Sequence, residues 1–388
     1  MLSNRLPAPP VPSSEALAHS RQLAGLIADR IAGAGGWISF ADYMTLALYA
    51  PGLGYYAGGA HKFGAAGDFV TAPELTPLFG QTLATQAVQI LHVSTPEILE
   101  LGAGSGRLAV DLLGELARLD CLPMRYAILE VSPDLRQRQQ ARIRQEIPGL
   151  ADRVVWLDGL PENFSGLVIG NEVLDALPVH LVRRQDGTWL ERGVGTGEGG
   201  FFWSDRPIEA GALFDAAQAL PSPDGDYVTE INLAAPAMIR SLAERLVCGA
   251  LLFIDYGFSR AEYYYPERRN GTLMCHYRHR AYDDPFHLPG LADITAHVDF
   301  TAIADAALEG GLDVPGYASQ ANFLFNCGLL DRLSALEPGS LDYIKQTSRV
   351  QKLVQPTEMG ELFKVMALAR GVEAPLRGFR RGDLRHQL

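Results

Sequence analysis

The chain has 388 residues, of which 47% are hydrophobic and 20% are charged. This balance is typical of a globular protein with a sizeable core, and it excludes disordered and fibrous chains. The formal net charge of −12 argues against a nucleic acid as the main partner, because a polyanion would be repelled. The same charge favours a cationic substrate, although an acidic balance more often serves solubility alone.

The first residues and the cysteines limit the cellular context. The opening MLSNRLPAPPVPSS has several prolines and one arginine, so we expect a disordered lead over residues 1–13 and no secretory signal. No apolar run reaches the roughly 20 residues that span a bilayer, so no membrane insertion is expected. The four cysteines are scattered without CxxC spacing, which argues against disulfides and structural zinc and favours a reducing compartment.

The N-terminal quarter alternates helical and loop-like patterns. Apolar residues recur near a 3.6-residue period over 14–34, which predicts a helix. Residues 49–69 are rich in Gly, Pro and aromatic side chains, a composition typical of ordered loops. Residues 75–91 again have a helical pattern. We expect residues 14–95 to form a helical and loop region that acts as a lid.

From residue 97 onward, short apolar runs alternate with helical patterns, which indicates a parallel sheet. The expected strands comprise residues 97–101, 126–130, 154–157, 166–170 and 251–255, with two more supplied by 314–326 and 362–369. A helix over 107–119 follows the first strand, and Ser132 with Pro133 can begin the next helix. We therefore predict an α/β fold, a doubly wound, Rossmann-like seven-stranded sheet within residues 96–370.

Two insertions interrupt this pattern. Roughly 80 residues separate the fourth strand from the fifth, which exceeds an ordinary connection. Residues 180–203 alternate and turn at Asp186 and Gly187, like a hairpin. We expect a smaller lobe from the N-terminal region and the insertions at about 178–226 and 257–298, and a C-terminal tail over 371–388.

The strongest chemical signal is ILELGAGSGRL at residues 98–108, where an apolar strand ends in a glycine-rich turn and enters a helix. Glycines leave the backbone bare, so a ligand can lie against it near a helix N-terminus. Gly102, Gly104 and Gly106 give GxGxG, whereas the dinucleotide fingerprint is GxGxxG and would need a glycine at Arg107. The spacing therefore disfavours a nicotinamide-dependent dehydrogenase, the first alternative on this fold.

Acidic residues at strand ends refine this prediction. Glu100 stands two residues before the first glycine, where it would repel phosphates and suit a ligand that carries an ammonium and a sulfonium. Glu130 ends the second strand, where an acid in doubly wound folds binds ribose hydroxyls. Asp158 ends the third strand and could bind an adenine amino group, or could be an exposed turn residue.

Further segments complete the pattern. They are GYY at 54–56, GDFVTAPELTPLFG at 67–80, ELGAGSGRLA at 100–109, NEVLDALPVH at 171–180, IDYG at 254–257 and DITAHVDF at 293–300. Together they resemble the MidA-like family of class I methyltransferases over about residues 35–370. ELGAGSG is shared by methyltransferases in general, whereas GDFVTAP, NEVLDALP and DITAHVDF are more specific to this family.

The resemblance implies S-adenosyl-L-methionine as the cofactor and a protein arginine as the methyl acceptor, since the mitochondrial member is a complex I assembly factor that dimethylates an arginine. It implies the cytoplasm of a bacterium, or the mitochondrial matrix of a eukaryote. No metal is needed for an in-line displacement that depends on positioning. The residues expected around the cofactor are Asp68, Thr71, Pro73, Glu100, Gly102, Ala103, Gly104, Gly106, Glu130, Val131, Ser132, Asp158, Gly159, Asn171 and Glu172.

Candidate catalytic residues follow the fourth strand. A guanidinium has a pKa above about 12, so carboxylates must orient it and take up or stabilise the departing proton. If a helix starts here, Glu172 and Asp175 share one face and could bind a cation, although Asn171 or Asp175 could instead cap that helix. Alternation places His297 and Asp299 on one side of an extended segment, where they could contact the substrate.

Asp68, Thr71 and Pro73 lie in a loop that we interpret as a lid over the methionine end of the cofactor, with Gly64 and Gly67 allowing it to move. An ordinary Ω-loop is the alternative. Two other functions stay open for the chain. One is methyl transfer to a small molecule or to another protein side chain, and the other is a cofactor-binding assembly module without turnover.

Overall fold

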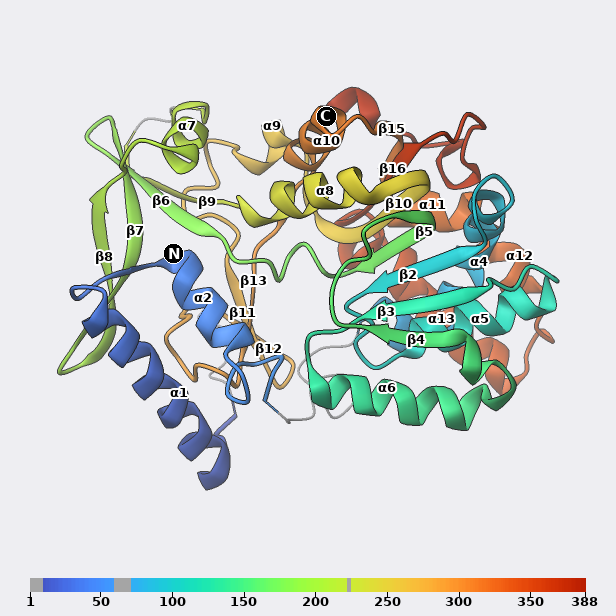
Figure 1. The fold of residues 1–388 in the computed structure, drawn as a ribbon, viewed down its shortest axis with the longest axis horizontal. Coiled ribbons are helices and arrows are strands. Elements are labelled where there is room, and N and C mark those ends of the chain that lie inside the picture. Colours follow the sequence, from blue (N-terminus) through green and yellow to red (C-terminus); the bar gives the residue numbers. More distant parts are fainter. Residues whose placement is uncertain (1–9, 59–70, 222–224) are drawn as a thin grey trace. The chain divides into compact units, whose positions relative to one another are not determined.

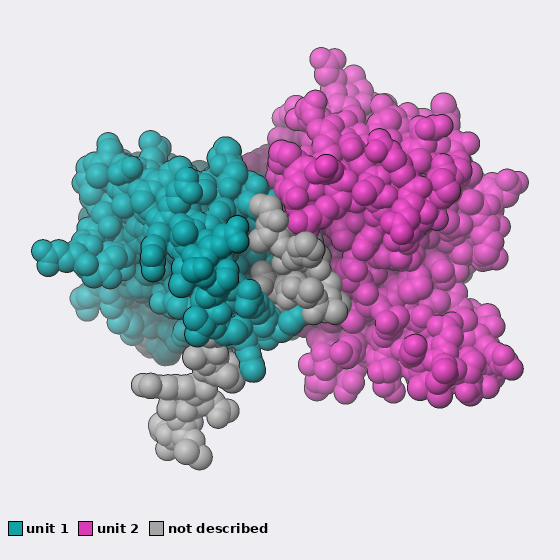
Figure 2. Space-filling view, turned by 90° about the horizontal axis from the view of Figure 1, so that it is seen from below, with its two compact units in different colours: residues 1–69, 175–235, 261–297 teal, residues 70–174, 236–260, 298–388 magenta. Residues whose placement is uncertain are grey.

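The structure is a computed structural model that describes residues 10–58, 71–221 and 225–388. The chain forms two compact units, which Figure 2 shows in teal and magenta. Unit 1 comprises residues 1–69, 175–235 and 261–297, and unit 2 comprises residues 70–174, 236–260 and 298–388. The expected N-terminal region, 14–95, is thus divided between the two units.

Unit 2 is built on a mostly parallel sheet (Figure 1). Among the described residues this sheet has eight strands, in the order β15-β16-β10-β5-β2-β3-β4 with β14 beside β10. The neighbours along β10-β5-β2-β3-β4 pair in parallel, whereas β16 is antiparallel to both β10 and β15. The strands are β2 (Glu97–Leu101), β3 (Arg125–Leu129), β4 (Val154–Leu157), β5 (Phe164–Asn171), β10 (Leu246–Phe258), β14 (Val298–Asp299), β15 (Asp313–Ser319) and β16 (Phe363–Arg370).

The predicted α/β sheet is confirmed, with two differences. The described sheet has one strand more than the seven expected, because the two-residue β14 pairs with the end of β10. The predicted strand over 314–326 is wrong in its second half, where α11 (Gln320–Asn326) forms. Ser319 explains this boundary, because its Oγ accepts a hydrogen bond from the Asn322 N–H at 3.4 Å and caps the helix.

Helices cover this sheet. They are α3 (Ala72–Leu75), α4 (Pro77–Leu91), α5 (Arg107–Arg118), α6 (Pro133–Glu146), α8 (Ala234–Arg245), α10 (Phe300–Glu309), α11, α12 (Leu329–Ser334) and α13 (Leu341–Val354). The predicted start of α6 is confirmed, because Ser132 occupies the N-cap position and Pro133 the first helical position. Apolar side chains of α4, α5 and the central strands form one continuous core, which fixes the strand ends where the candidate site lies.

Unit 1 contains two small antiparallel sheets and its own helices. One sheet has the order β1-β7-β6-β9 with β8 on β7, and the other has the order β12-β11-β13. The strands are β1 (Ile38–Ser39), β6 (His180–Gln185), β7 (Thr188–Gly197), β8 (Gly200–Pro207), β9 (Tyr227–Ile231), β11 (Met274–Tyr277), β12 (Arg280–Tyr282) and β13 (Asp293–Thr295). The helices are α1 (Ser14–Gly33), α2 (Phe40–Tyr49) and α7 (Ala212–Gln218), while α9 (Arg260–Tyr263) begins at the last residue of a unit 2 segment.

The predicted hairpin between β6 and β7 is confirmed, with Asp186 and Gly187 both at positive φ, +50° and +81°. The core of unit 1 joins segments far apart in sequence. The Tyr43 hydroxyl, for example, donates to the Pro285 carbonyl at 2.7 Å. Aromatic rings of α2, β8 and the loop before β13 pack around it.

Three further observations concern the chain as a whole. No helix in the described ranges is long and apolar enough to cross a membrane. The four cysteines are free thiols. Residues 371–388, expected as a tail, belong to unit 2, where Phe379 is buried with its ring 5.3 Å from that of Phe323.

Candidate functional site

The connections of the parallel sheet reverse direction between β2 and β5. From β2 the chain continues to β3 on one side, whereas from β5 it continues to β10 on the other. The loops after these two strands therefore diverge, and doubly wound folds bind their ligands at such a point. Residues 102–106 and 171–174 are placed there by the strand order alone.

The glycine-rich loop after β2 has a backbone conformation that residues with side chains rarely adopt. Gly102, Gly104 and Gly106 have φ of +59°, +52° and +80°, in the left-handed region. A Cβ on Gly102 would lie 3.4 Å from Val173 Cγ2, and one on Gly106 would lie 3.3 Å from Gln139 Cα. Gly106 is also the N-cap of α5. The loop thus presents bare backbone at a helix N-terminus, as a ligand cradle requires.

Glu100 is a buried carboxylate at the end of β2. It is 3% exposed, and one oxygen accepts a hydrogen bond from the Tyr126 hydroxyl at 2.8 Å. Burial raises the pKa of Glu100 from 4.5 to about 7, the bond from Tyr126 opposes this shift, and the charge of Glu130 adds to it. A cation bound nearby would favour the ionised form and lower that pKa again.

Glu130 follows β3 and is held in place from two sides. The Ser132 N–H donates to one of its oxygens at 2.9 Å, and Gln139 Nε2 donates to the other at 2.9 Å. A carboxylate offers about four lone-pair sites, and binding of ribose hydroxyls by this one stays a prediction. Val131 beside it is 72% exposed, whereas Ser132 is buried and its hydroxyl caps α6 through the Leu135 N–H.

Gln139 is a buried residue of the candidate site that the sequence analysis missed. Its Nε2 donates both to Glu130 and to the Gly104 carbonyl, at 2.9 Å each, and its Oε1 accepts from Trp156 Nε1 at 2.9 Å. The buried side-chain amide of Gln139 thus fixes the glycine loop relative to Glu130, the candidate for ribose binding. The sequence feature that could have indicated a buried Gln139 is its spacing, because it follows Leu135 by four residues and therefore lies on the same, buried side of α6.

The backbone after β5 is strained at Glu172. Its φ is +53°, which is rare for a residue with a side chain, and such strain is concentrated at functional sites. The Glu172 N–H donates to the Ile254 carbonyl at 2.8 Å, and Asn171 Nδ2 donates to Glu172 Oε1 at 3.0 Å. Asn171 Oδ1 is buried and has no hydrogen-bond partner among the described residues. The strained residue and an unsatisfied amide oxygen thus lie next to each other, directly after β5.

Asp255, at the end of β10, holds this strained turn. Its Oδ2 accepts from the N–H groups of Val173 and Leu174 at 3.1 and 2.8 Å, and its Oδ1 accepts from the Tyr256 N–H at 2.9 Å. The carboxylate is buried. Asp255 is thus a positioning residue for the backbone beside Glu172.

Comparison with known proteins identifies the family of the chain. Residues 82–318, more than half of the chain, match the model of a family of S-adenosyl-L-methionine-dependent methyltransferases. The chain belongs to this family. The resemblance drawn from the motifs is thereby confirmed, and the enzyme is an S-adenosylmethionine-dependent methyltransferase.

Related proteins agree with this assignment. The mitochondrial protein arginine methyltransferase NDUFAF7 homolog of Drosophila melanogaster is 30% identical over 372 residues, which is 87% of this chain and 83% of that protein. Its mouse counterpart is 30% identical over 86% of this chain and 81% of that protein. A crystal structure from Burkholderia thailandensis, of a likely methyl transferase bound to S-adenosyl-homocysteine, is 51% identical with a TM-score of 0.95, covering 98% of this chain and 100% of that chain.

The residues of this methyltransferase fit its cofactor. The bare loop at Gly102–Gly106 leaves room for a ligand, and the buried Glu100 carboxylate gains a counter-charge from an ammonium or a sulfonium. Ala103, inside the loop, is buried at 7% exposure. Individual contacts of these residues with the cofactor stay predictions.

The outer candidates of the methyltransferase are more exposed or lie outside the described residues. The Asp158 side chain is 90% exposed and pairs with Arg136 at 2.7 Å, and Gly159 is exposed beside it, so their adenine role stays a prediction. Thr71 precedes α3, and Pro73 is buried in its first turn. Asp68, Gly64 and Gly67 lie outside the described residues.

Several catalytic predictions need correction. The described residues between β5 and β6 contain no helix, so Glu172 and Asp175 do not share a helix face, and they fall in different units. His297 and Asp299 do not lie on one continuous strand, because β13 ends at Thr295 and β14 begins at Val298.

Asp299 and its neighbours have structural contacts of their own. Asp299 Oδ1 caps α10 by accepting from the Thr301 and Ala302 N–H groups at 3.0 and 3.2 Å. In unit 1, the Asp175 carbonyl accepts from the Ala296 N–H at 3.1 Å, and the His297 N–H donates to Thr272 Oγ1 at 3.0 Å. The cap accounts for the position of Asp299, and the catalytic roles of Asp175, His297 and Asp299 stay predictions.

The raised pKa of Glu100 predicts a pH dependence of cofactor binding. If the ligand's cation binds the ionised carboxylate, affinity falls as pH drops below about 7. We expect S-adenosyl-homocysteine to bind roughly eightfold more tightly at about pH 7.5 than at about pH 6. Calorimetry in buffers of different ionisation enthalpy would also detect proton release on binding.

The variant Glu100→Gln provides the control. Its affinity should vary little over this range, and its free form should be more stable than the parent at high pH. The sign follows because the folded pKa of about 7 lies above the unfolded value of 4.5, so the parent loses stability as pH rises from about 4.5 to about 7 and stays at the lower level above it. Identical pH profiles for parent and variant would show that Glu100 does not control binding.

Gln139→Leu tests the link between the loop and Glu130. The change keeps most of the side-chain volume but removes the hydrogen bonds that Gln139 makes with Glu130, the Gly104 carbonyl and the Trp156 N–H. We expect affinity for S-adenosyl-homocysteine to fall about tenfold and the free energy of unfolding to fall by about 2 kcal/mol. Gln145→Leu, at an exposed position of the same helix, is the control and should change neither quantity.

Proposed function

We propose that this methyltransferase transfers methyl groups to an arginine side chain of a protein substrate. The observation that carries the proposal is Glu172, a carboxylate held in a strained backbone conformation at the ligand end of β5. Two proteins that are 30% identical to this chain are named protein arginine methyltransferases. The net charge of −12 also favours a cationic acceptor.

The chemistry gives each residue a task. S-adenosylmethionine, when bound, supplies a methyl group on a sulfonium that a nucleophile can displace. A guanidinium is protonated near neutral pH, so it becomes a nucleophile only where an acceptor takes its proton. We assign that role to Glu172, and the fixed orientation of its carboxylate to Asn171 and to the turn that Asp255 holds. Alignment of the acceptor then supplies much of the rate.

Labelled cofactor and a peptide set test the acceptor. Peptides that differ only in one residue, arginine, lysine or citrulline, would be incubated with the enzyme, and the products identified by mass spectrometry. Methylated arginine in the first peptide alone supports the proposal. Methylation of lysine, or transfer only to small molecules of a lysate, would replace the arginine acceptor with one of the alternatives. Cofactor binding without any turnover would indicate an assembly module.

The resemblance to the mitochondrial assembly factor extends the proposal to the identity of the substrate. We propose that the acceptor belongs to a subunit of respiratory complex I. Methylation of complex I subunits purified from a strain that lacks this enzyme supports the assignment. Transfer to unrelated proteins at the same rate would contradict it.

A further inference from the structure

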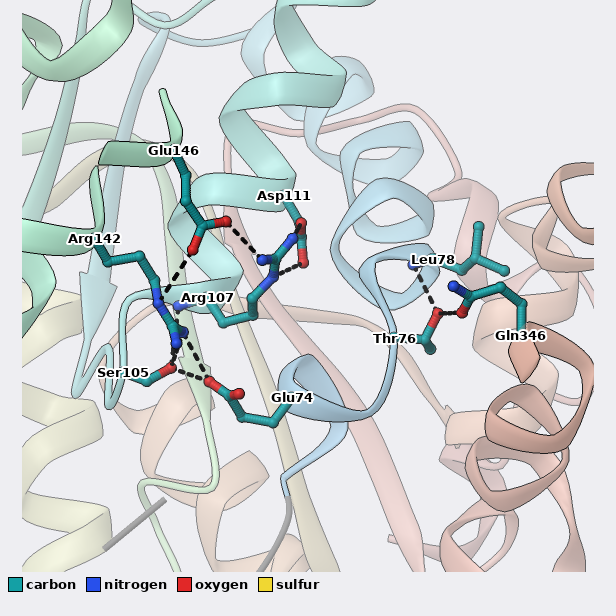
Figure 3. A network of polar contacts seen from close by, with 9 residues as sticks. All are labelled: Glu74, Thr76, Leu78, Ser105, Arg107, Asp111, Arg142, Glu146 and Gln346. Carbon is teal, nitrogen blue, oxygen red and sulfur yellow. Dashed lines mark hydrogen bonds and ion pairs between the residues drawn. The ribbon is translucent and has the colours of Figure 1, made fainter. Parts of the chain in front are cut away.

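A row of alternating charges connects the glycine loop to three helices of unit 2 (Figure 3). Its members come from α3, the loop, α5 and α6. They are Glu74, Ser105, Arg107, Asp111, Arg142 and Glu146. None of them is explained by the cofactor contacts proposed above, and all lie in one unit.

Arg142 stands at the junction of three segments. Its Nη1 donates to Ser105 Oγ at 2.7 Å and to Glu74 Oε1 at 2.9 Å, and the Ser105 hydroxyl donates to the same Glu74 oxygen. The side chains of Arg142 and Glu74 are 29% and 16% exposed. Such a partly buried, charge-assisted contact is stronger than a surface ion pair. The three side chains therefore tie α3, α6 and the glycine loop together.

The remaining charges fix the direction of Arg142. Glu146, one turn further along α6, lies 3.4 Å from Arg142 Nε and 2.8 Å from Arg107 Nη1. Arg107 in turn donates two bonds to Asp111 on α5. The alternation leaves the guanidinium of Arg142 facing Ser105 and Glu74.

The segment that carries Glu74 is also anchored independently at its other end. Thr76 Oγ1 donates to Gln346 Oε1 of α13 at 2.7 Å and accepts from the Leu78 N–H at 3.2 Å (Figure 3). Loss of Arg142 would therefore separate Ser105 and Glu74 from α6 without detaching the start of α4.

We propose that Glu74, Ser105 and Arg142 form a positioning triad that holds the glycine loop in its cofactor-binding conformation. Ser105 lies between Gly104 and Gly106, so its hydroxyl is the point at which a loop of bare backbone is fixed from outside. Gln139 holds the carbonyl of Gly104 from the same helix, three residues before Arg142. The triad contributes to cofactor affinity without contacting the cofactor.

The test compares Arg142→Ala with Arg144→Ala, which removes the same charge from an exposed position of the same helix. We expect the Kd for S-adenosyl-homocysteine to rise about tenfold in the first variant and to stay unchanged in the second. The KM for S-adenosylmethionine should rise in parallel, while kcat at saturating cofactor stays near that of the parent. Arg142→Lys should restore part of the affinity.

A double-mutant cycle separates positioning from a general stabilising effect. Glu74→Gln should weaken binding on its own but add little to Arg142→Ala, because both remove the same triad. Ser105→Ala, a smaller change, provides the same measurement if Arg142→Ala folds poorly. The proposal is overturned if melting temperature falls while Kd is unchanged, or if the two single effects add.

Discussion

Replacement of Gly104 by valine should abolish cofactor binding while the protein still folds. Valine would place two methyl groups where the bare loop receives its ligand, so we expect the Kd to rise at least about 100-fold. The φ of +52° also makes a β-branched residue unfavourable, at a cost of about 1–2 kcal/mol in stability. Calorimetric titration with S-adenosyl-homocysteine and a thermal melt measure the two effects separately.

The control for backbone strain is Gly187→Val, in the hairpin turn of unit 1. Gly187 also has a positive φ, +81°, and a Cβ there would meet open space. This variant should lose a similar amount of stability and bind the cofactor as the parent does. Unchanged affinity in Gly104→Val would refute the assignment of the loop.

Glu172→Gln should leave cofactor affinity within about twofold and lower methyl transfer by at least about 100-fold. Glutamine keeps the size of the side chain and its contact with Asn171, but it cannot accept the proton that a guanidinium must lose. Single-turnover assays with a validated acceptor, beside a binding titration, distinguish the two quantities. Equal transfer rates in parent and variant would exclude Glu172 as the proton acceptor.

A second substitution at the same position separates chemistry from folding. Glu172→Gly relieves the strain at φ +53°, but it also makes the unfolded chain more flexible. These effects oppose each other, so we expect the free energy of unfolding to stay within about 1 kcal/mol of the parent. A stable but inactive protein is the expected result, whereas full activity would indicate that the side chain has no role.

Much of the sheet could be predicted because its signals are local. Buried parallel strands are short apolar runs, and residues 97–101 and 154–157 form strands with the predicted bounds. The glycine loop was equally visible, since only glycine adopts its three positive φ angles easily. The segment 320–326 was mistaken for strand because its apolar run fits either structure, and the cap by Ser319 decides for helix.

The supporting residues of the site could not be found in this way. Gln139 and Arg142 belong to a helix whose sequence is largely polar, and nothing nearby in the chain indicates that they face the glycine loop. Their partners follow from how α6 packs after β3, which is a tertiary effect. The sequence analysis named Glu172 as a site residue but did not predict its strained backbone. That conformation depends on Asp255, 83 positions away on another strand, whose carboxylate holds the turn.

The division of the chain has a consequence for synthesis on the ribosome. The polypeptide passes between the two units five times, at residues 69/70, 174/175, 235/236, 260/261 and 297/298. The hydrogen bond from the Tyr43 hydroxyl to the Pro285 carbonyl can form only after 242 further residues have been synthesised. At ordinary elongation rates this interval is roughly 10–50 s, during which the apolar faces of α1 and α2 have no finished core to enter. We therefore expect the nascent N-terminal helices to expose apolar surface that a chaperone can bind until unit 1 is complete.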